Sequence, residues 1–146
     1  MQDRLKDEMK QAMRSRAKER LGVIRLIMAA IKQKEVDERI VLDDQQVIVV
    51  LDKMLKQRRD SIKQYRAANR DDLAEVEEAE VLVIQEFLPQ ALTEDEISEM
   101  VQSAIVDCSA SSIKDMGKVM AIIKPAMQGK ADMAVVSTKI KAMLAT

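Results

Sequence analysis

The sequence predicts an all-α protein, and two observations support this. Three Gly and two Pro in 146 residues leave little turn chemistry, while the helix-favouring residues Ala, Leu, Met, Lys, Glu, Gln and Arg are abundant. Apolar residues also recur at the spacing of helix faces along most of the chain. We expect an elongated N-terminal domain of about four helices over residues 1–90, followed by a small three-helix bundle over residues 91–146.

The first two helices are predicted from their apolar residues. One apolar stripe extends from Leu5 to Met13, and a polar break over residues 15–18 ends that helix. A second helix is predicted over residues 17–37. Its apolar side chains surround the helix almost completely, interrupted only by Gly22 and Arg25. A helix that is apolar on all sides is expected to lie between other helices.

The third and fourth helices are predicted from their ends. Asp43 with Gln46 three residues later resembles a capping box, so a long helix is expected to begin there. Asn69 is expected to close that helix in the left-handed conformation, and Asp71 to cap the next one. The fourth helix would then fold back beside the third.

The segment Pro89–Leu92 is the best-marked boundary in the chain. The fourth helix must end near Pro89, because the residue before a proline avoids the helical conformation. Thr93 with Glu96 then forms a second capping-box pattern. Three more helices are expected, and the residues that begin or close them are Thr93, Ser112, Gly129 and Asp132.

The composition excludes much of enzyme chemistry. The chain has no His and one Cys, so an imidazole base, a zinc site that needs His and an internal disulfide are all ruled out. Carboxylates recur at helical spacing over residues 71–80, but a di-metal helical site normally adds His. Ser111 and Ser112 near Lys114 suggest a Ser–Lys nucleophile, although helix capping explains these serines more simply. We expect no catalytic residue, no metal and no cofactor.

The formal net charge of −1 conceals segments of opposite sign. Residues 1–36 hold ten basic and five acidic side chains, residues 53–70 hold seven and one, and residues 71–99 hold eleven acidic and no basic ones. Such segments either pair with each other or form a stripe that binds a partner. The longest apolar runs are too short to span a bilayer, and the first residues are charged. We therefore expect a cytoplasmic protein without a membrane partner.

Two groups of basic residues are candidates for contact with nucleic acid. In the first, steps of three and four residues place the cations on one side of the third helix. Its members are Lys56, Arg59, Lys63, Arg66 and Arg70. In the second, Gly117 is expected to permit close helix approach, and a Gly-Lys corner is expected to bring three lysines near one end. The members of this second group are Lys118, Lys124, Gly129 and Lys130, with Lys139 and Lys141 as helpers. With only Tyr65 and Phe87 as aromatic residues, any RNA contact would be made to shape and backbone and not by stacking.

Six segments, in order along nearly the whole chain, resemble the GatB/YqeY family, and the stand-alone YqeY-like proteins in particular. They are residues 21–25 (LGVIR), 57–61 (QRRDS), 69–73 (NRDDL), 87–92 (FLPQAL), 115–120 (DMGKVM) and 129–132 (GKAD). Two positions depart from the family pattern. Asn69 stands where Gly is usual, and Met133 stands where Gly or Pro is usual.

The resemblance implies an all-helical fold with a C-terminal domain of the GatB/YqeY type. The module is similar to the tail of the B subunit of the glutamine-dependent amidotransferase that acts on mischarged tRNA. That tail helps to recognise tRNA, whereas the chemistry occurs in other domains, and the family is associated with carbon–nitrogen ligases that use glutamine as amido-N-donor. This sequence lacks the synthetase cradle domain and an amidase nucleophile.

Together these observations predict a binding module for tRNA or another structured RNA that is not an enzyme by itself. The alternative is a protein–protein interaction adaptor, which would use the acidic 71–99 face or the Met-rich bundle.

Overall fold

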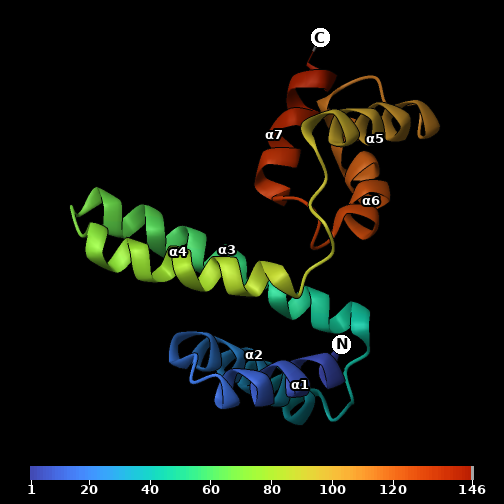
Figure 1. Cartoon of the computed structure of the whole chain (residues 1–146). Coiled ribbons are helices and arrows are strands. Elements are labelled where there is room, and N and C mark those ends of the chain that lie inside the picture. The colour runs from blue at the N-terminus through green and yellow to red at the C-terminus, as the bar shows by residue number, and fades with distance from the viewer. Residues whose placement is uncertain (146) are drawn as a thin grey trace. The chain divides into compact units, whose positions relative to one another are not determined.

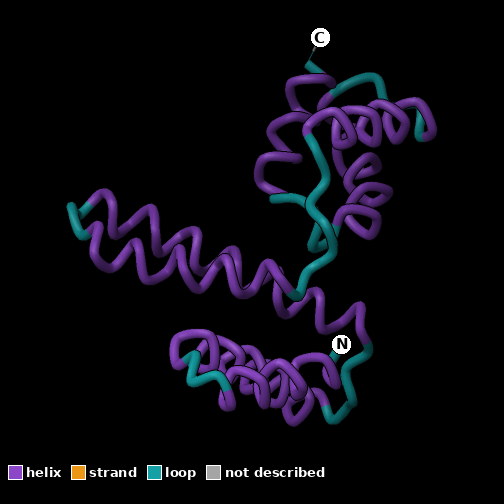
Figure 2. Tube along the Cα trace, viewed as in Figure 1, coloured by secondary structure: helices purple, strands orange, loops and turns teal. Residues whose placement is uncertain are grey.

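The computed structural model describes residues 1–145, and every regular element among them is helical (Figures 1 and 2). The α-helices are α1 (Gln2–Arg14), α2 (Lys18–Glu38), α3 (Asp44–Ala67), α4 (Asp71–Glu86), α5 (Glu94–Asp107), α6 (Met116–Met127) and α7 (Met133–Leu144), and a 3₁₀ turn, η1 (Ile113–Asp115), precedes α6. The all-α prediction is confirmed. The chain forms two compact units, Met1–Pro89 and Gln90–Thr146.

The N-terminal unit has its core at one end of the α3–α4 hairpin. Buried side chains come from α1, from α2, from the first half of α3 and from the end of α4. The largest of those that are fully buried are Leu5, Ile24, Ile27, Leu51, Ile84 and Phe87. Helix α2 contacts α1, α3 and α4 on this side. The core therefore joins four helices at the base of the hairpin.

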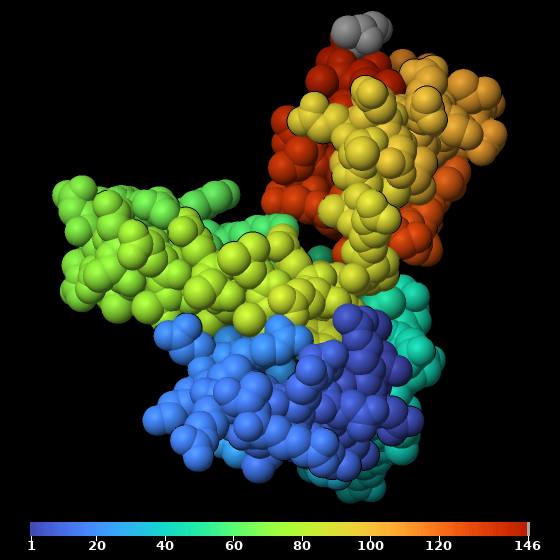
Figure 3. Space-filling model, viewed as in Figure 1, coloured from blue at the N-terminus to red at the C-terminus, as the bar shows by residue number. Residues whose placement is uncertain are grey.

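Beyond this core, α3 and α4 continue side by side as a two-helix arm (Figure 1). We define the arm as residues 58–80. Ala74 is its buried residue, whereas Ile62, Tyr65 and Leu73 are half-buried. In the space-filling view, the green tip of the arm reaches beyond the blue α1–α2 hairpin (Figure 3). The arm thus exposes more of its surface than the base does.

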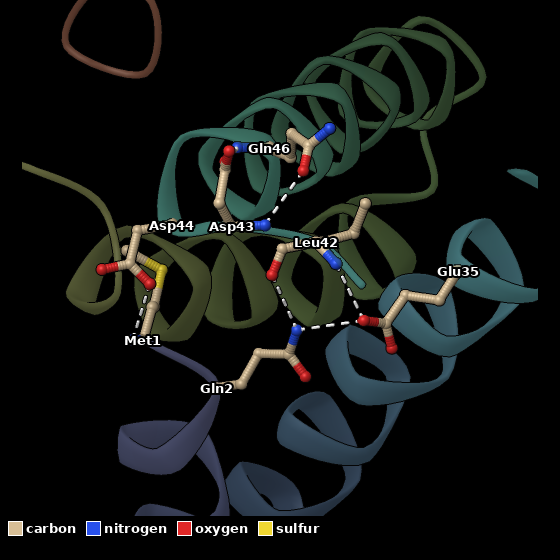
Figure 4. Close-up of polar contacts among 7 residues, drawn as sticks. All are labelled: Met1, Gln2, Glu35, Leu42, Asp43, Asp44 and Gln46. Atoms are coloured by element: carbon tan, nitrogen blue, oxygen red, sulfur yellow. Dashed lines mark hydrogen bonds and ion pairs between the residues drawn. The ribbon is translucent and has the colours of Figure 1, made fainter. Parts of the chain in front are cut away.

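The loop between α2 and α3 is held by a polar network (Figure 4). A carboxylate oxygen of Glu35 accepts hydrogen bonds from Leu42 N at 2.9 Å and from Gln2 Nε2 at 3.3 Å. The Leu42 side chain is 4% exposed and anchors the loop in the core. Asp43 and Gln46 form the expected capping box, each side chain bonding to the other's backbone N–H. The sequence prediction for the start of α3 is confirmed.

The C-terminal unit packs α5, α6 and α7 around one small core. Its fully or almost fully buried residues are Val101, Ala104, Val119, Ile123, Met127, Val136 and Ile140. Leu92 N donates to Lys130 O at 2.9 Å, which ties the start of the unit to the turn between α6 and α7. Most of the methionines here are half-buried against this core, so the Met-rich composition serves packing.

Several expected helix ends need correction. Asp71 does not cap α4: the capping residue is Arg70, and Asp71 is the first helical residue, where its carboxylate pairs with Arg66. The helix expected to begin at Ser112 begins at Met116, because the 3₁₀ turn comes first. Thr93 accepts from Glu96 N as expected, but the Glu96 carboxylate bonds to the Thr93 hydroxyl rather than to its backbone N–H.

The role expected for Gly117 is wrong. A Cβ placed on this residue would meet no atom within 4 Å, so no helix approaches closely there. The two left-handed turns that the sequence predicts are present, with φ of 58° at Asn69 and 77° at Gly129, and Arg16, Arg39 and Ser109 are left-handed residues that the sequence did not predict. No helix within residues 1–145 combines the length and the hydropathy that a membrane span requires.

Candidate nucleic-acid interface

The cations of the arm are largely occupied by carboxylates of the same unit. Arg66 pairs with Glu78 and with Asp71, and Arg70 pairs with Asp72 through two bonds of 3.1 Å. The hydrogen bond to Glu78 raises the pKa of Arg66, and that to Asp72 raises the pKa of Arg70. These two guanidiniums are therefore tied to carboxylates of α4.

Three further arm residues complete this picture. Arg58 Nε donates to Glu80 at 2.9 Å, and both side chains are more than three-quarters buried. Arg59 is half-buried and interacts within the chain, whereas Lys63 is exposed. The expectation that segments of opposite charge pair with each other is thus correct for Arg58, Arg66 and Arg70, because the acidic helix α4 lies directly against the basic helix α3.

The lysines of α6 do not gather at one end. Lys118 lies in the first turn of α6, 3.7 Å from the Asp115 carboxylate. Lys124 lies in the last turn, and six residues of helix separate the two by about 9 Å along the axis. Lys130 follows in the turn at Gly129 and is half-buried. Lys124 and Lys130 thus lie at the C-terminal end of α6 and in the turn after it, and Lys118 lies at the other end of the helix.

The two lysines of α7 also separate. Residues two apart on a helix point about 200° apart, so Lys139 and Lys141 lie on different sides of α7. Lys139 Nζ donates to the carbonyl oxygen of Glu94 at 3.3 Å, and this hydrogen bond links α7 to the start of α5. Lys141 is exposed in the last turn. Within residues 1–145, Lys124, Lys130 and Lys141 form no ion pair.

The sequence did not predict one polar cluster, which lies around Arg20. Arg20 pairs with Glu8 and Glu86, and the bond to Glu86 raises the pKa of Arg20 most. The guanidiniums of Arg4 and Arg20 also lie 5.1 Å and 5.8 Å from the centre of the Phe87 ring. This cluster fastens the end of α4 to α1 and α2. Phe87 was its one signal in the sequence, as one of two aromatic residues.

Among the described residues, no three side chains of His, Cys, Asp or Glu converge in the way a metal ion needs. The Ser111 N–H and hydroxyl both bond to the Asp115 carboxylate, and the backbone bond lowers the pKa of Asp115. Ser111 thus takes part in the turn that starts α6.

A family model described as "Yqey-like protein" matches residues 2–144 of this chain. The chain belongs to this family. The helical fold and the order of the six sequence segments agree with that membership.

Two curated relatives of this chain are fungal proteins. "Altered inheritance of mitochondria protein 41, mitochondrial" of Pyrenophora tritici-repentis is 33% identical over 94% of this chain and 77% of its own length. The protein of the same name from Candida glabrata is 36% identical over 59% of this chain and 48% of its own length. The chain therefore spans only about half the length of some relatives that it matches. Both names contradict the cytoplasmic location that we expected, because both are named as mitochondrial proteins.

Proposed function

We propose that this YqeY-family chain is an RNA-binding module that contacts tRNA or another structured RNA through lysines of its C-terminal unit. The contact is electrostatic and is made to the phosphate backbone, since the chain has two aromatic residues for stacking. The module carries out no amide transfer by itself. Any link to glutamine-dependent carbon–nitrogen ligation is through a larger assembly.

One observation carries the proposal: three arginines of the arm are paired, whereas three lysines of the C-terminal unit are not. Lys56 and Lys63 on α3 also form no ion pair within residues 1–145, but α3 packs against the acidic α4, whose charge opposes a phosphate backbone. Arg58, Arg66 and Arg70 of the arm are already paired with carboxylates. Lys124, Lys130 and Lys141 form no ion pair within residues 1–145, so their charge is available to phosphate. Lys124 and Lys130, at the end of α6 and in the turn after it, are therefore assigned the main contact, and Lys118 and the arm cations a smaller one.

The test is binding of bulk tRNA to the full chain, measured by fluorescence anisotropy over a salt series. We expect affinity to fall steeply with salt, and Lys124→Glu with Lys130→Glu to weaken binding by roughly tenfold. The matched control is Lys56→Glu with Lys63→Glu on the exposed side of α3, which changes the net charge equally. We expect at most a twofold to threefold loss for this control. Circular dichroism checks that both variants keep their helix content.

Two results would overturn the proposal. One is no measurable binding of tRNA at low salt. The other is an equal loss for both double variants, which would assign binding to net charge alone. Glutamine turnover by the purified chain, which we expect to be zero, would reinstate a catalytic role.

The adaptor alternative finds less support. Asp71, Asp72, Glu78, Glu80 and Glu86 of the acidic segment are engaged within their own unit. An adaptor would nevertheless retain its protein partner through high salt, whereas an RNA contact would be lost. Co-purification at two salt concentrations separates the two functions.

A further inference from the structure

Helix α2 has two faces suited to packing, and the N-terminal unit covers one of them. Val23, Ile24, Ile27 and Ile31 are at most 5% exposed and face the core. A second row lies on the opposite side of the helix, at steps of four, three, four and three residues. Its members are Gly22, Leu26, Ala29, Gln33 and Val36, and all are exposed. We call this row the outer seam.

The sequence predicts that α2 lies between neighbouring helices, and the outer seam is the side on which no such neighbour is found within residues 1–145. A helix that is apolar on nearly all sides is expected to lie between neighbours. Within residues 1–145, the neighbours of α2 pack on its core side, while Leu26 remains 49% and Val36 60% exposed. A Cβ on Gly22 would meet nothing within 4 Å, so the small residue here serves no contact inside the unit. The spacing is that of a helix-packing seam without its second helix.

One edge of the outer seam is uniformly basic. Its cations on α2 are spaced seven residues apart and lie along the same side of the seam. They are Lys18, Arg25 and Lys32, and Arg39 follows just past the end of the helix; all four are exposed and none is in an ion pair within residues 1–145. Lys32 and Ala29 also line a groove between α1 and α2, to which α1 contributes Lys6 and α2 also contributes Glu35. The groove thus holds two lysines and one carboxylate, and that carboxylate is already bonded to Leu42 N and Gln2.

We propose that the outer seam binds an acidic amphipathic helix of a partner protein. Apolar side chains of that helix would cover Leu26, Ala29 and Val36, and carboxylates on its flank would meet the basic edge. Nucleic acid fits less well, because a phosphate backbone offers nothing to an apolar row. A second copy of this chain also fits less well. Antiparallel pairing would oppose the two basic edges, and parallel pairing would place the basic turns around Arg16 side by side.

The test uses the full chain and two labelled 28-residue peptides. Both peptides have Leu and Ala at the seam positions of four heptads. The first, the Glu peptide, has Glu along one flank and Gln along the other. The second, the Lys peptide, has Lys in place of each Glu. We expect the Glu peptide to bind and to gain helix content, and the Lys peptide to bind at least tenfold more weakly. Raising the salt concentration should weaken the Glu peptide only in part, because the apolar contact persists.

Variants locate the site. Leu26→Glu should abolish binding of the Glu peptide, and Arg25→Glu with Lys32→Glu should weaken it at least tenfold. The matched controls are Leu82→Glu on α4, where the side chain is 65% exposed, and Lys63→Glu on α3. Neither control should change binding. Sedimentation of the unmodified chain should show a monomer.

Several outcomes would overturn the proposal. These are no binding of the Glu peptide, equal binding of both peptides, or an unchanged affinity for Leu26→Glu. A chain that dimerises through Leu26 would assign the seam to a second copy. Loss of tRNA binding in the Arg25→Glu and Lys32→Glu variant, with peptide binding intact, would assign the basic edge to nucleic acid.

Discussion

The arm and the C-terminal unit have comparable basic sequences but use them differently. In the arm, guanidiniums on α3 meet the carboxylates of α4 across the hairpin. In the C-terminal unit, residues 113–146 hold six lysines, four of them on α6 and α7, with Asp115 and Asp132 as the acidic residues. Whether the side chains of a charged segment form ion pairs thus depends on which helix packs beside that segment. In the arm the arginine charge is paired within the fold, whereas in the C-terminal unit Lys118 is paired with Asp115 and Lys124, Lys130 and Lys141 form no ion pair within residues 1–145.

The largest expected effect tests whether the two regions are independent. Ile123 is 1% exposed in the C-terminal core. Ile123→Ala should cost that unit about 3 kcal/mol of unfolding free energy, because it leaves a cavity. Hydrogen exchange followed by mass spectrometry should show lost protection in peptides of residues 90–145 and unchanged protection in residues 1–89. Equal loss in both would mean that the two cores fold as one.

The next effect tests the charge pairing in the arm. Arg58 donates to the Met54 carbonyl oxygen at 3.4 Å as well as to Glu80, and its side chain is 14% exposed. Arg58→Ala should therefore lower the unfolding free energy of the N-terminal unit by about 2 kcal/mol. Urea unfolding measures this. Lys63→Ala, at an exposed position on the same helix, should stay within about 0.5 kcal/mol of the unmodified chain.

Local signals in the sequence predict the fold well. The Asp43–Gln46 capping box and the left-handed positions at Asn69 and Gly129 depend on residues within one or two turns. The role of Gly117 and the capping of α4 could not be predicted this way. The role of Gly117 depends on how near another helix lies. The capping of α4 depends on the ion pair between Asp71 and Arg66, which engages the Asp71 carboxylate.

The candidate site is predicted less well, for the same reason. Sequence periodicity places Lys56, Arg59, Lys63 and Arg66 on one helix correctly, whereas Arg70 lies beyond α3 as the capping residue of α4. Periodicity also carries no information on which carboxylates face these cations. Arg58, which lies outside that stripe, forms an ion pair with Glu80 in which both side chains are more than three-quarters buried. Likewise, the basic edge of α2 becomes visible only when the core side of that helix is known.

A smaller effect compares the two left-handed turns. Gly129 has a φ of 77° and Asn69 a φ of 58°, and the two residue types tolerate such angles differently. Gly129→Ala should destabilise the C-terminal unit by about 1 kcal/mol, because a Cβ strains this conformation. Asn69→Gly should change the N-terminal unit by less than about 0.5 kcal/mol, since glycine adopts this conformation readily. Thermal unfolding of the two variants tests the difference, and equal effects would contradict it.

The smallest effect concerns a device that both units share, a carboxylate that holds a loop by accepting a backbone N–H. The Leu42 N–H lowers the pKa of Glu35 below its ordinary 4.5, and the Ser111 N–H lowers the pKa of Asp115 below its ordinary 3.8. A lowered pKa means that the charged form stabilises the fold above the ordinary value and that this contribution is lost as the pH falls.

Glu35→Gln and Asp115→Asn should therefore destabilise their units at pH 7 and make little difference once the pH is well below these ordinary values. The amide keeps an acceptor oxygen but loses the charge, which is why the effect is small. Unfolding midpoints measured from pH 7 to pH 3 should show the two curves converging with that of the unmodified chain. Glu38→Gln, the same charge change at an exposed position at the end of α2, is the control. A difference for Glu35→Gln that persisted in acid would mean that the geometry of the side chain, and not its charge, holds the loop.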